Sequence, residues 1–422
     1  MTRNPKSRPP WGRRIAVVLA GLALTVAGVL VITQVILVDD SESVDVSPAG
    51  PFYEDPNPIP NGKPGLILKT EPQPVASSTN APAGTTLQKI LYLSTDPQTG
   101  KRVPVSGQIW VPPGPVPRGG RPVIAWAHGT SGIASPCAPS LVTDPHPATQ
   151  PGFSEFLNKG WVVVATDYRG LGTQGPLAYL VGASSGRNVL DSIRAARNIP
   201  EAHASDRVVV WGHSQGGQSA LFAGQLAATY APELKLLGVA AAAPAAELGQ
   251  ILQDDYKELE GLVVISFALW SWSHTQPGAD LADIVGPDAR DLIDSIASRC
   301  VNTNKDIFED LPAAEVEKLA GTINPAKLTA HPAWARIEQD NTPTTTGKGV
   351  PLLIAQGTAD TIIHPPTTEA LVTAFCKSGR TVDFFTMPGV SHPLAGLEAA
   401  PQVAGWAANL FANKPVPNTC SG

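Results

Sequence analysis

A serine at the apex of a strand–turn–helix sequence restricts the fold of this chain more than any other feature. Residues 208–211 are apolar and mostly β-branched, and residues 218–224 follow as a helix-forming segment. Ser214 stands between them, with Gly212 and Gly216 two residues away on either side. A serine at so sharp a turn has a strained backbone, and small neighbours let strand and helix approach closely. The pattern predicts a nucleophilic serine after a buried strand, with a purely structural turn as the weaker alternative.

Strands and helices alternate along most of the chain. Apolar residues run continuously through the expected strands, which is typical of strands buried on both faces of a sheet. The expected strands are 123–127, 161–165, 208–211, 234–243, 351–356 and 382–386. The expected helices are 153–159, 186–198, 218–224, 367–377 and 401–411. A hairpin is expected within 87–112. This order predicts a mostly parallel sheet with helices on both faces. Together with the serine turn, it indicates the α/β-hydrolase fold.

The alternation breaks between residues 246 and 348, where helix-like pieces occur without a clear strand. We expect residues 246–348 to be a helical cap, inserted between a first core part, residues 51–245, and a second core part, residues 349–422. Residues 51–82 are rich in proline and are expected to lie on the domain as an extended arm. Residues 39–50 are acidic and rich in serine, which favours a tether.

An uncharged stretch of twenty-four residues, 15–38, precedes the tether. At about 1.5 Å per helical residue it is long enough to cross a hydrocarbon core of about 30 Å. Residues 1–14 carry five basic side chains and no acid, so the positive-inside rule places them in the cytoplasm and the rest of the chain outside. We expect an extracytoplasmic protein anchored in the membrane by residues 15–38. The alternative is secretion after signal cleavage, but the stretch is long for a signal and no clear A-x-A site follows.

The charges argue against a nucleic-acid partner, and the cysteines indicate disulfides and no metal site. The chain has 30 basic and 36 acidic residues, a formal net charge of −6, whereas nucleic-acid binding needs clustered Lys and Arg, so no nucleic-acid partner is expected. Four cysteines outside the cytoplasm indicate two disulfides with three possible connectivities. These cysteines are Cys137, Cys300, Cys376 and Cys420. They form neither a C-x-x-C pair nor a cluster with histidine, so no metal site is predicted.

A serine hydroxyl is a weak nucleophile that needs a base within hydrogen-bond reach, and the base needs an orienting carboxylate. In the α/β-hydrolase order the acid and then the histidine follow the serine, each in a loop after a strand. Asp360 follows the expected strand 351–356, and His392 follows the expected strand 382–386. We therefore predict Asp360 as the acid and His392 as the base. Asp167, which also ends a strand, is interpreted as a buried turn carboxylate.

The negatively charged oxygen that forms during ester cleavage needs preorganised donors. The backbone N–H of Gln215, directly after the nucleophile and at a helix N-terminus, is the first predicted donor. The second is the N–H of Thr130, in the loop after the expected strand 123–127. His128 is interpreted as a structural residue below this loop, and His213 is not expected to face Ser214 productively.

With these residues in hand, the chain resembles the secretory lipase family of α/β-hydrolases, of the yeast lipase A type. The resemblance covers residue 51 to the C-terminus. Besides the serine turn, it rests on Phe52-Tyr53, His128-Gly129-Thr130, Cys137-Ala138-Pro139-Ser140, the stretch 167–172 and the stretch 179–191. It implies hydrolysis of carboxylic esters, including lipids, without a cofactor, and a helical cap between the nucleophile and the acid.

The same resemblance implies which cysteines pair. Cys137 would join Cys300 and tie the sheet domain to the cap, and Cys376 would join Cys420 and pin the C-terminus. The long membrane-spanning start departs from the cleavable signal that is usual in the family.

The cap stretch 262–272 is strongly apolar. We expect it to line an acyl pocket through Phe267, Trp270 and Trp272, with packing in the core of the cap as an equally weighted alternative. The whole sequence therefore predicts a membrane-tethered serine esterase or lipase acting on ester or lipid substrates. An acyltransferase with the same three residues is the nearest alternative, and a catalytically inactive binding module is a more distant one. The oligomeric state is left open.

Overall fold

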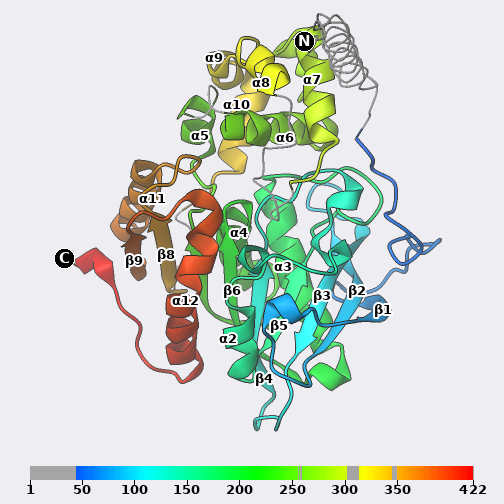
Figure 1. Cartoon of the computed structure of the whole chain (residues 1–422), viewed down its shortest axis with the longest axis vertical. Coiled ribbons are helices and arrows are strands. Elements are labelled where there is room, and N and C mark those ends of the chain that lie inside the picture. Colours follow the sequence, from blue (N-terminus) through cyan, green and yellow to red (C-terminus); the bar gives the residue numbers. More distant parts are fainter. Residues whose placement is uncertain (1–43, 255, 257–258, 302–312, 345–348, 422) are drawn as a thin grey trace, which may run out of the picture. The chain divides into compact units, whose positions relative to one another are not determined.

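The computed structural model describes residues 44–421 apart from 255, 257–258, 302–312 and 345–348 (Figure 1). The predicted basic segment 1–14 and the predicted membrane anchor 15–38 lie outside the described residues. Within the described ranges, no helix is both long enough and apolar enough to cross a lipid bilayer.

A nine-stranded sheet runs through the described part of the chain in the order β1-β2-β3-β5-β4-β6-β7-β8-β9. Its strands are β1 (Ile67–Gln73), β2 (Thr86–Thr95), β3 (Arg102–Val111), β4 (Arg121–Ala127), β5 (Val162–Thr166), β6 (Ala204–His213), β7 (Lys235–Ala242), β8 (Leu352–Gly357) and β9 (Val382–Met387). The pairs β1·β2, β2·β3 and β3·β5 are antiparallel, and every other neighbouring pair is parallel. The predicted mostly parallel sheet and the predicted hairpin, formed by β2 and β3, are confirmed.

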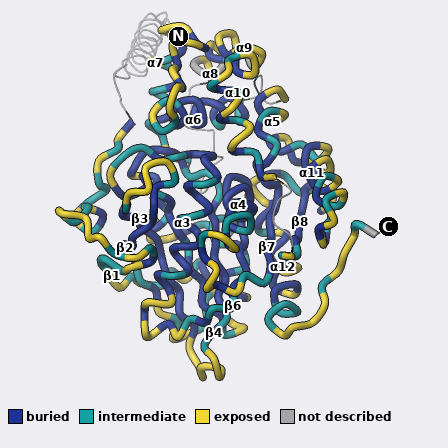
Figure 2. Tube along the Cα trace, turned by 180° about the vertical axis from the view of Figure 1, so that it is seen from behind, coloured by how far each residue is buried: buried dark blue, intermediate teal, exposed yellow. Residues whose placement is uncertain are grey.

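Helices cover both faces of this sheet (Figure 1). On one face, α3 (Gly182–Arg197) and α4 (Gln215–Tyr230) pack against each other and against the central strands. On the opposite face, α2 (Phe153–Asn158) and α12 (Ala395–Phe411) pack together. Helix α11 (Pro365–Lys377) packs against β8 and β9. Figure 2 shows that the central strands are buried along most of their length. Burial on both faces explains why their sequences are apolar without alternation.

Between β7 and β8 the described α-helices form a group that we call the cap. It consists of α5 (Leu248–Asp254), α6 (Leu259–Thr275), α7 (Pro287–Ala297), α8 (Ala313–Ala320), α9 (Pro325–Ala330) and α10 (Pro332–Asp340). Figure 1 shows these helices gathered beyond one end of the sheet. These helices lie in the stretch for which the sequence predicted helical pieces. Helices α9 and α10 begin with proline at the first helical position, where its missing N–H costs least.

Strand β1 and helix α12, both outside the cap, differ from the expectation. The arm 51–82 contains strand β1, whose residues are all partly or fully exposed and which pairs with β2 alone, so it has no buried apolar run to reveal it. Helix α12 begins at Ala395 instead of residue 401, with Pro401 inside it. Because proline favours the first turn of a helix, the sequence placed this start too late.

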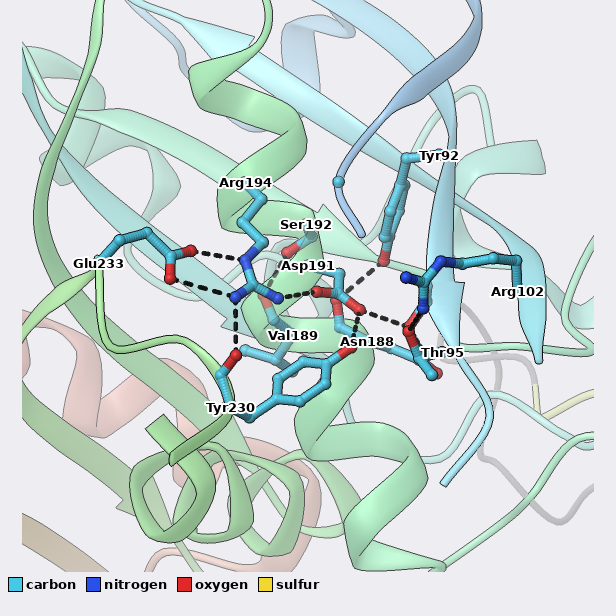
Figure 3. Close-up of polar contacts among 12 residues, drawn as sticks. Tyr92, Thr95, Arg102, Asn188, Val189, Asp191, Ser192, Arg194, Tyr230 and Glu233 are labelled. Atoms are coloured by element: carbon cyan, nitrogen blue, oxygen red, sulfur yellow. Dashed lines mark hydrogen bonds and ion pairs between the residues drawn. The ribbon is translucent and has the colours of Figure 1, made fainter. Parts of the chain in front are cut away.

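A buried polar network joins α3 to β2 and to the end of α4 (Figure 3). The carboxylate of Asp191 accepts hydrogen bonds from Ser94 Oγ at 2.7 Å, Tyr230 Oη at 2.8 Å and Arg194 Nη1 at 2.8 Å. Arg194 also pairs with the more exposed Glu233. Burial raises the pKa of Asp191 to about 6, although its donors oppose the shift. A buried carboxylate is tolerated here because every donor around it is placed by secondary structure.

Two disulfides fasten loops to the core. Cys137 is bonded to Cys300, and Cys376 is bonded to Cys420, which is the pairing implied by the resemblance. Beside the first disulfide, Val301 N donates to Ser131 O, so the segment after α7 is joined to the loop after β4. A covalent link across 163 residues restricts the unfolded chain strongly.

Candidate active site

The predicted serine turn has the backbone that its glycines suggested. Strand β6 ends at His213, helix α4 begins at Gln215, and Ser214 between them has φ 56° and ψ −122°. A Cβ on Gly216 would lie 1.9 Å from the carbonyl oxygen of Ala127, and one on Gly212 would lie 2.0 Å from the carbonyl oxygen of Gly216. Strand, turn and helix can therefore approach this closely only with glycine at both positions.

The structure brings Ser214, Asp360 and His392 into one hydrogen-bonded chain. His392 Nε2 lies 2.8 Å from Ser214 Oγ, and His392 Nδ1 lies 2.8 Å from Asp360 Oδ2. All three residues are buried. Asp360 lies in the loop after β8, and His392 begins a short 3-10 turn after β9, so each follows the carboxyl end of a parallel strand.

The surroundings of Asp360 fix the tautomer of His392. Asp360 Oδ1 accepts hydrogen bonds from the N–H groups of Ile362 at 3.0 Å and Ile363 at 2.8 Å. Burial alone would raise the pKa of Asp360, but the His392 ring and these N–H groups hold it below the ordinary value. Asp360 is therefore an ionised acceptor, so Nδ1 of His392 carries the hydrogen. Nε2 is left free to accept the Ser214 hydroxyl.

His213 supports the loop of His392. Its Nε2 donates to the backbone carbonyl of His392 at 2.9 Å, and the two rings are tilted with their centroids 4.9 Å apart. Burial, together with the neighbouring His392, lowers the pKa of His213 to about 3, so the ring is neutral. His213 thus holds the backbone of the predicted base and is not itself placed as a second base for Ser214.

The two predicted oxyanion donors lie beside the nucleophile. Gln215 opens α4, and the neighbouring loop approaches so closely that a Cβ on Gly129 would lie 3.8 Å from Ser214 Cβ. No acceptor in the described part of the chain takes a hydrogen bond from the backbone N–H of Gln215 or Thr130. Both N–H groups are therefore available to a ligand, and the positive end of the α4 dipole adds to the attraction for an anion.

Asp167 and His128 are buried and line the same cavity as Ser214. Asp167 accepts hydrogen bonds from the N–H and hydroxyl of Ser140 and from Ser106 Oγ at 2.7 Å. Burial raises the pKa of Asp167 to about 6. Burial lowers the pKa of His128 to about 4, and its ring nitrogens contact the carbonyls of Gly129 and Asp167. Both residues have the structural surroundings that the sequence interpretation gave them.

Ser214 and His392 open into a cavity of about 850 Å³. Its apolar wall includes Trp126 of β4, Phe153 of α2 and the cap residues Val263 and Val264 of α6. Both cysteines of the Cys137–Cys300 disulfide also line it, so the covalent link between loop and cap forms part of the wall. A concave, largely apolar cavity next to a few polar groups is the usual form of a small-molecule site.

The lining of this cavity bears on the acyl-pocket residues expected in the cap. It contains none of Phe267, Trp270 and Trp272, which the structure buries among other cap and core residues. The Phe267 ring meets Tyr179 edge to face, Trp270 stacks on His274, and Trp272 contacts Trp334. Helix α6 is apolar on all sides, so its sequence pattern could not indicate that Val263 and Val264 face the cavity.

Comparisons with known proteins place the chain among lipases. The family model described as "Secretory lipase" matches residues 151–419, more than half of the chain. Lipase A of Arthroderma benhamiae is 24% identical over 383 residues, which cover 84% of this chain and 78% of the relative. A protein of Mycobacterium tuberculosis named as a probable inactive lipase is 24% identical over 398 residues, covering 87% and 82%.

Solved structures share the architecture. Candida antarctica lipase A superposes with a TM-score of 0.72 at 20% identity and covers 88% of both chains. The rice cell wall degrading esterase LipA from Xanthomonas oryzae gives a TM-score of 0.68 at 18% identity, covering 84% of this chain and all of the esterase. The predicted α/β-hydrolase fold is thereby confirmed. The chain belongs to the secretory lipase family and is a carboxylic ester hydrolase of the lipase and esterase type.

Proposed function

We propose that this hydrolase cleaves lipid-type carboxylic esters through an acyl-enzyme on Ser214. The observation that carries the proposal is the unbroken hydrogen-bond chain from Asp360 through His392 to Ser214 in the wall of the cavity. Because one relative is named as inactive, the proposal that this chain is active rests on its site residues more than on its family. In this chain Ser214, His392, Asp360 and the glycines of the turn are all present, which supports the proposal.

The first half of the reaction transfers the acyl group to the enzyme. Ser214 Oγ attacks the ester carbonyl while His392 Nε2 takes its proton, and the carboxylate of Asp360 stabilises the resulting imidazolium. The tetrahedral oxyanion binds the N–H groups of Gln215 and Thr130. The C–O bond to the alcohol then breaks, and His392 returns the proton to the departing alkoxide.

The second half releases the acid. Water attacks the acyl carbonyl while His392 takes its proton, the oxyanion forms again, and the bond to Ser214 Oγ breaks as the serine regains the proton. An alcohol in place of water would give acyl transfer from the same intermediate. Product analysis with added alcohol separates that alternative from hydrolysis.

The cavity supports the choice of substrate class. Its volume of about 850 Å³ exceeds what a short acyl group needs, and its walls carry aromatic and branched aliphatic side chains. Burying each methylene of an acyl chain against such a wall contributes about 0.8 kcal/mol. Residues 246–348, the proposed cap domain, supply part of this wall through α6.

We place the protein outside the cytoplasm, because two disulfides persist in oxidising compartments. Residues 15–38 serve as its membrane anchor, a proposal that rests on the sequence alone. An N-terminal tag should therefore stay on the mature, membrane-associated protein in an immunoblot. A tag that is lost while the protein appears in the medium would instead indicate a cleaved signal.

A phosphonate ester inhibitor tests the proposed nucleophile. Such a reagent forms a tetrahedral adduct with a serine that a neighbouring base activates. We expect one equivalent to bind, activity to fall in proportion, and peptide mass spectrometry to find the adduct on Ser214. Complete inactivation with the adduct on another residue would contradict the proposal.

A further inference from the structure

A tyrosine outside the predicted catalytic residues joins the cap to the loop after β4 that contains Thr130. The hydroxyl of Tyr179 lies 2.6 Å from Thr130 Oγ1, across 49 residues of chain. Tyr179 lies in the loop before α3 and is 1% exposed. Burial raises the pKa of its hydroxyl, which therefore remains a neutral phenol that can donate this hydrogen bond.

The cap helix α6 holds the backbone of Tyr179 on both sides. Ser271 Oγ accepts the N–H of Tyr179 at 2.8 Å and donates to the carbonyl of Leu177 at 2.6 Å. Trp272 Nε1 donates to the carbonyl of Tyr179 at 3.0 Å. The Phe267 ring adds an edge-to-face contact, with the two ring centroids 5.9 Å apart. Three side chains of one cap helix therefore determine where this tyrosine lies.

The other end of this connection lies at the proposed reaction centre. The hydrogen bond to Tyr179 restricts the χ1 angle of Thr130 and with it the backbone that carries the Thr130 N–H. Oxyanion donors act only when they lie about 2.7–3.1 Å from the position of the charged oxygen. A small displacement of this loop would therefore cost transition-state stabilisation without changing substrate binding.

We propose that Tyr179 is a positioning residue that transmits the placement of cap helix α6 to the Thr130 oxyanion donor. The inference rests on the proposed function, because it takes the N–H of Thr130 as a donor. It gives Phe267 and Trp272 a role in holding Tyr179, in place of the acyl-pocket role expected from the sequence.

Kinetics of Tyr179→Phe test the hydrogen bond itself. The variant keeps the ring and loses only the hydroxyl, so we expect kcat to fall about tenfold with KM within about twofold, since complete loss of an oxyanion donor costs about 10²–10³-fold. Phosphonate titration of active sites normalises kcat. Thr130→Val should give the same loss, Thr130→Ser should retain most of the activity, and the double variant Tyr179→Phe/Thr130→Val should be no worse than either single variant.

Two buried serines on α6 provide a test of the contact between the cap and Tyr179, together with its control. Ser271→Ala removes the acceptor of the Tyr179 N–H and should lower kcat with little change in KM. Ser266→Ala is its control, because Ser266 is equally buried on α6 but its hydroxyl donates to Leu262 of the same helix. Ser266→Ala should keep the kcat of the unmodified enzyme.

Several results would overturn the inference. These are an unchanged kcat in Tyr179→Phe, a rise in KM alone, or additive losses in the double variant. If Tyr179→Phe does not fold, as judged by circular dichroism, Thr130→Val against Thr130→Ser tests the same hydrogen bond from its other end. Failure of the proposed function looks different, because Ser214→Ala would then remain active whatever happens at residue 179.

Discussion

Ser214→Ala is expected to lower kcat/KM for a carboxylic ester by about 10⁶-fold while the protein stays folded. The variant removes the atom on which we propose that the acyl-enzyme forms. Oxyanion donors and substrate binding remain, and these alone leave a residual acceleration of about 10³–10⁴ over water. The fold should persist because alanine keeps the Cβ, so the strained turn at φ 56° is no more strained than before.

A second buried serine provides the control for this measurement. Ser192 on α3 is 1% exposed and donates to the carbonyl of Val189 in its own helix (Figure 3). Ser192→Ala should keep its activity within about twofold, because the hydroxyl lies in the polar network away from the cavity. Circular dichroism and thermal unfolding would confirm that both variants fold. Undiminished hydrolysis by Ser214→Ala would place the nucleophile elsewhere.

The sequence could locate these residues because strand ends have a local signature. Ser214 directly follows an apolar strand, whereas Asp360 and His392 each follow an apolar strand and a turn. Parallel strands present their carboxyl ends at one edge of the sheet. Burial on both faces made the apolar runs in these strands continuous and easy to recognise. The edge strand β1 lacked this signature, because exposure on an edge removes the apolar run.

The walls of the cavity could not be predicted in the same way. Helix α6 is apolar all round, and only tertiary packing decides that Val263 and Val264 face the cavity while Trp272 is buried in the cap. The contacts of Tyr179 were even less predictable from the sequence. Its partners, Thr130 and Ser271, lie 49 and 92 residues away along the chain. A hydrogen bond between distant segments has no periodicity or spacing by which a single sequence would reveal it.

Asp360→Asn is expected to lower kcat by about 10⁴-fold with little change in KM. The reason lies in the four hydrogen bonds around this side chain. Oδ1 accepts the N–H groups of Ile362 and Ile363, and Oδ2 accepts from His392 and from Gln356 Nε2 at 3.1 Å. An asparagine keeps the two backbone hydrogen bonds only if its carbonyl oxygen takes the Oδ1 position, so its NH₂ then faces His392.

That orientation changes the tautomer of the predicted base. An NH₂ group beside Nδ1 turns this nitrogen into an acceptor, so the hydrogen moves to Nε2, and Nε2 can no longer accept the Ser214 proton. The opposite orientation would set the NH₂ against the two backbone N–H groups, which is unfavourable because all are donors. In neither orientation does the amide supply the negative charge that stabilises the imidazolium.

Asp383→Asn is the matched control for this substitution. Asp383 is also buried and lies on β9, where it pairs in register with Leu353 of β8. Among the described residues, no hydrogen bond joins its side chain to the His392 ring. Steady-state kinetics should show a large loss in Asp360→Asn and nearly full kcat in Asp383→Asn, with both proteins folded. The rate of phosphonate labelling at Ser214 should fall in parallel with kcat, because labelling needs the same proton transfer. A loss confined to Asp383→Asn, or labelling that stays fast in Asp360→Asn, would show that His392 is oriented by a different group.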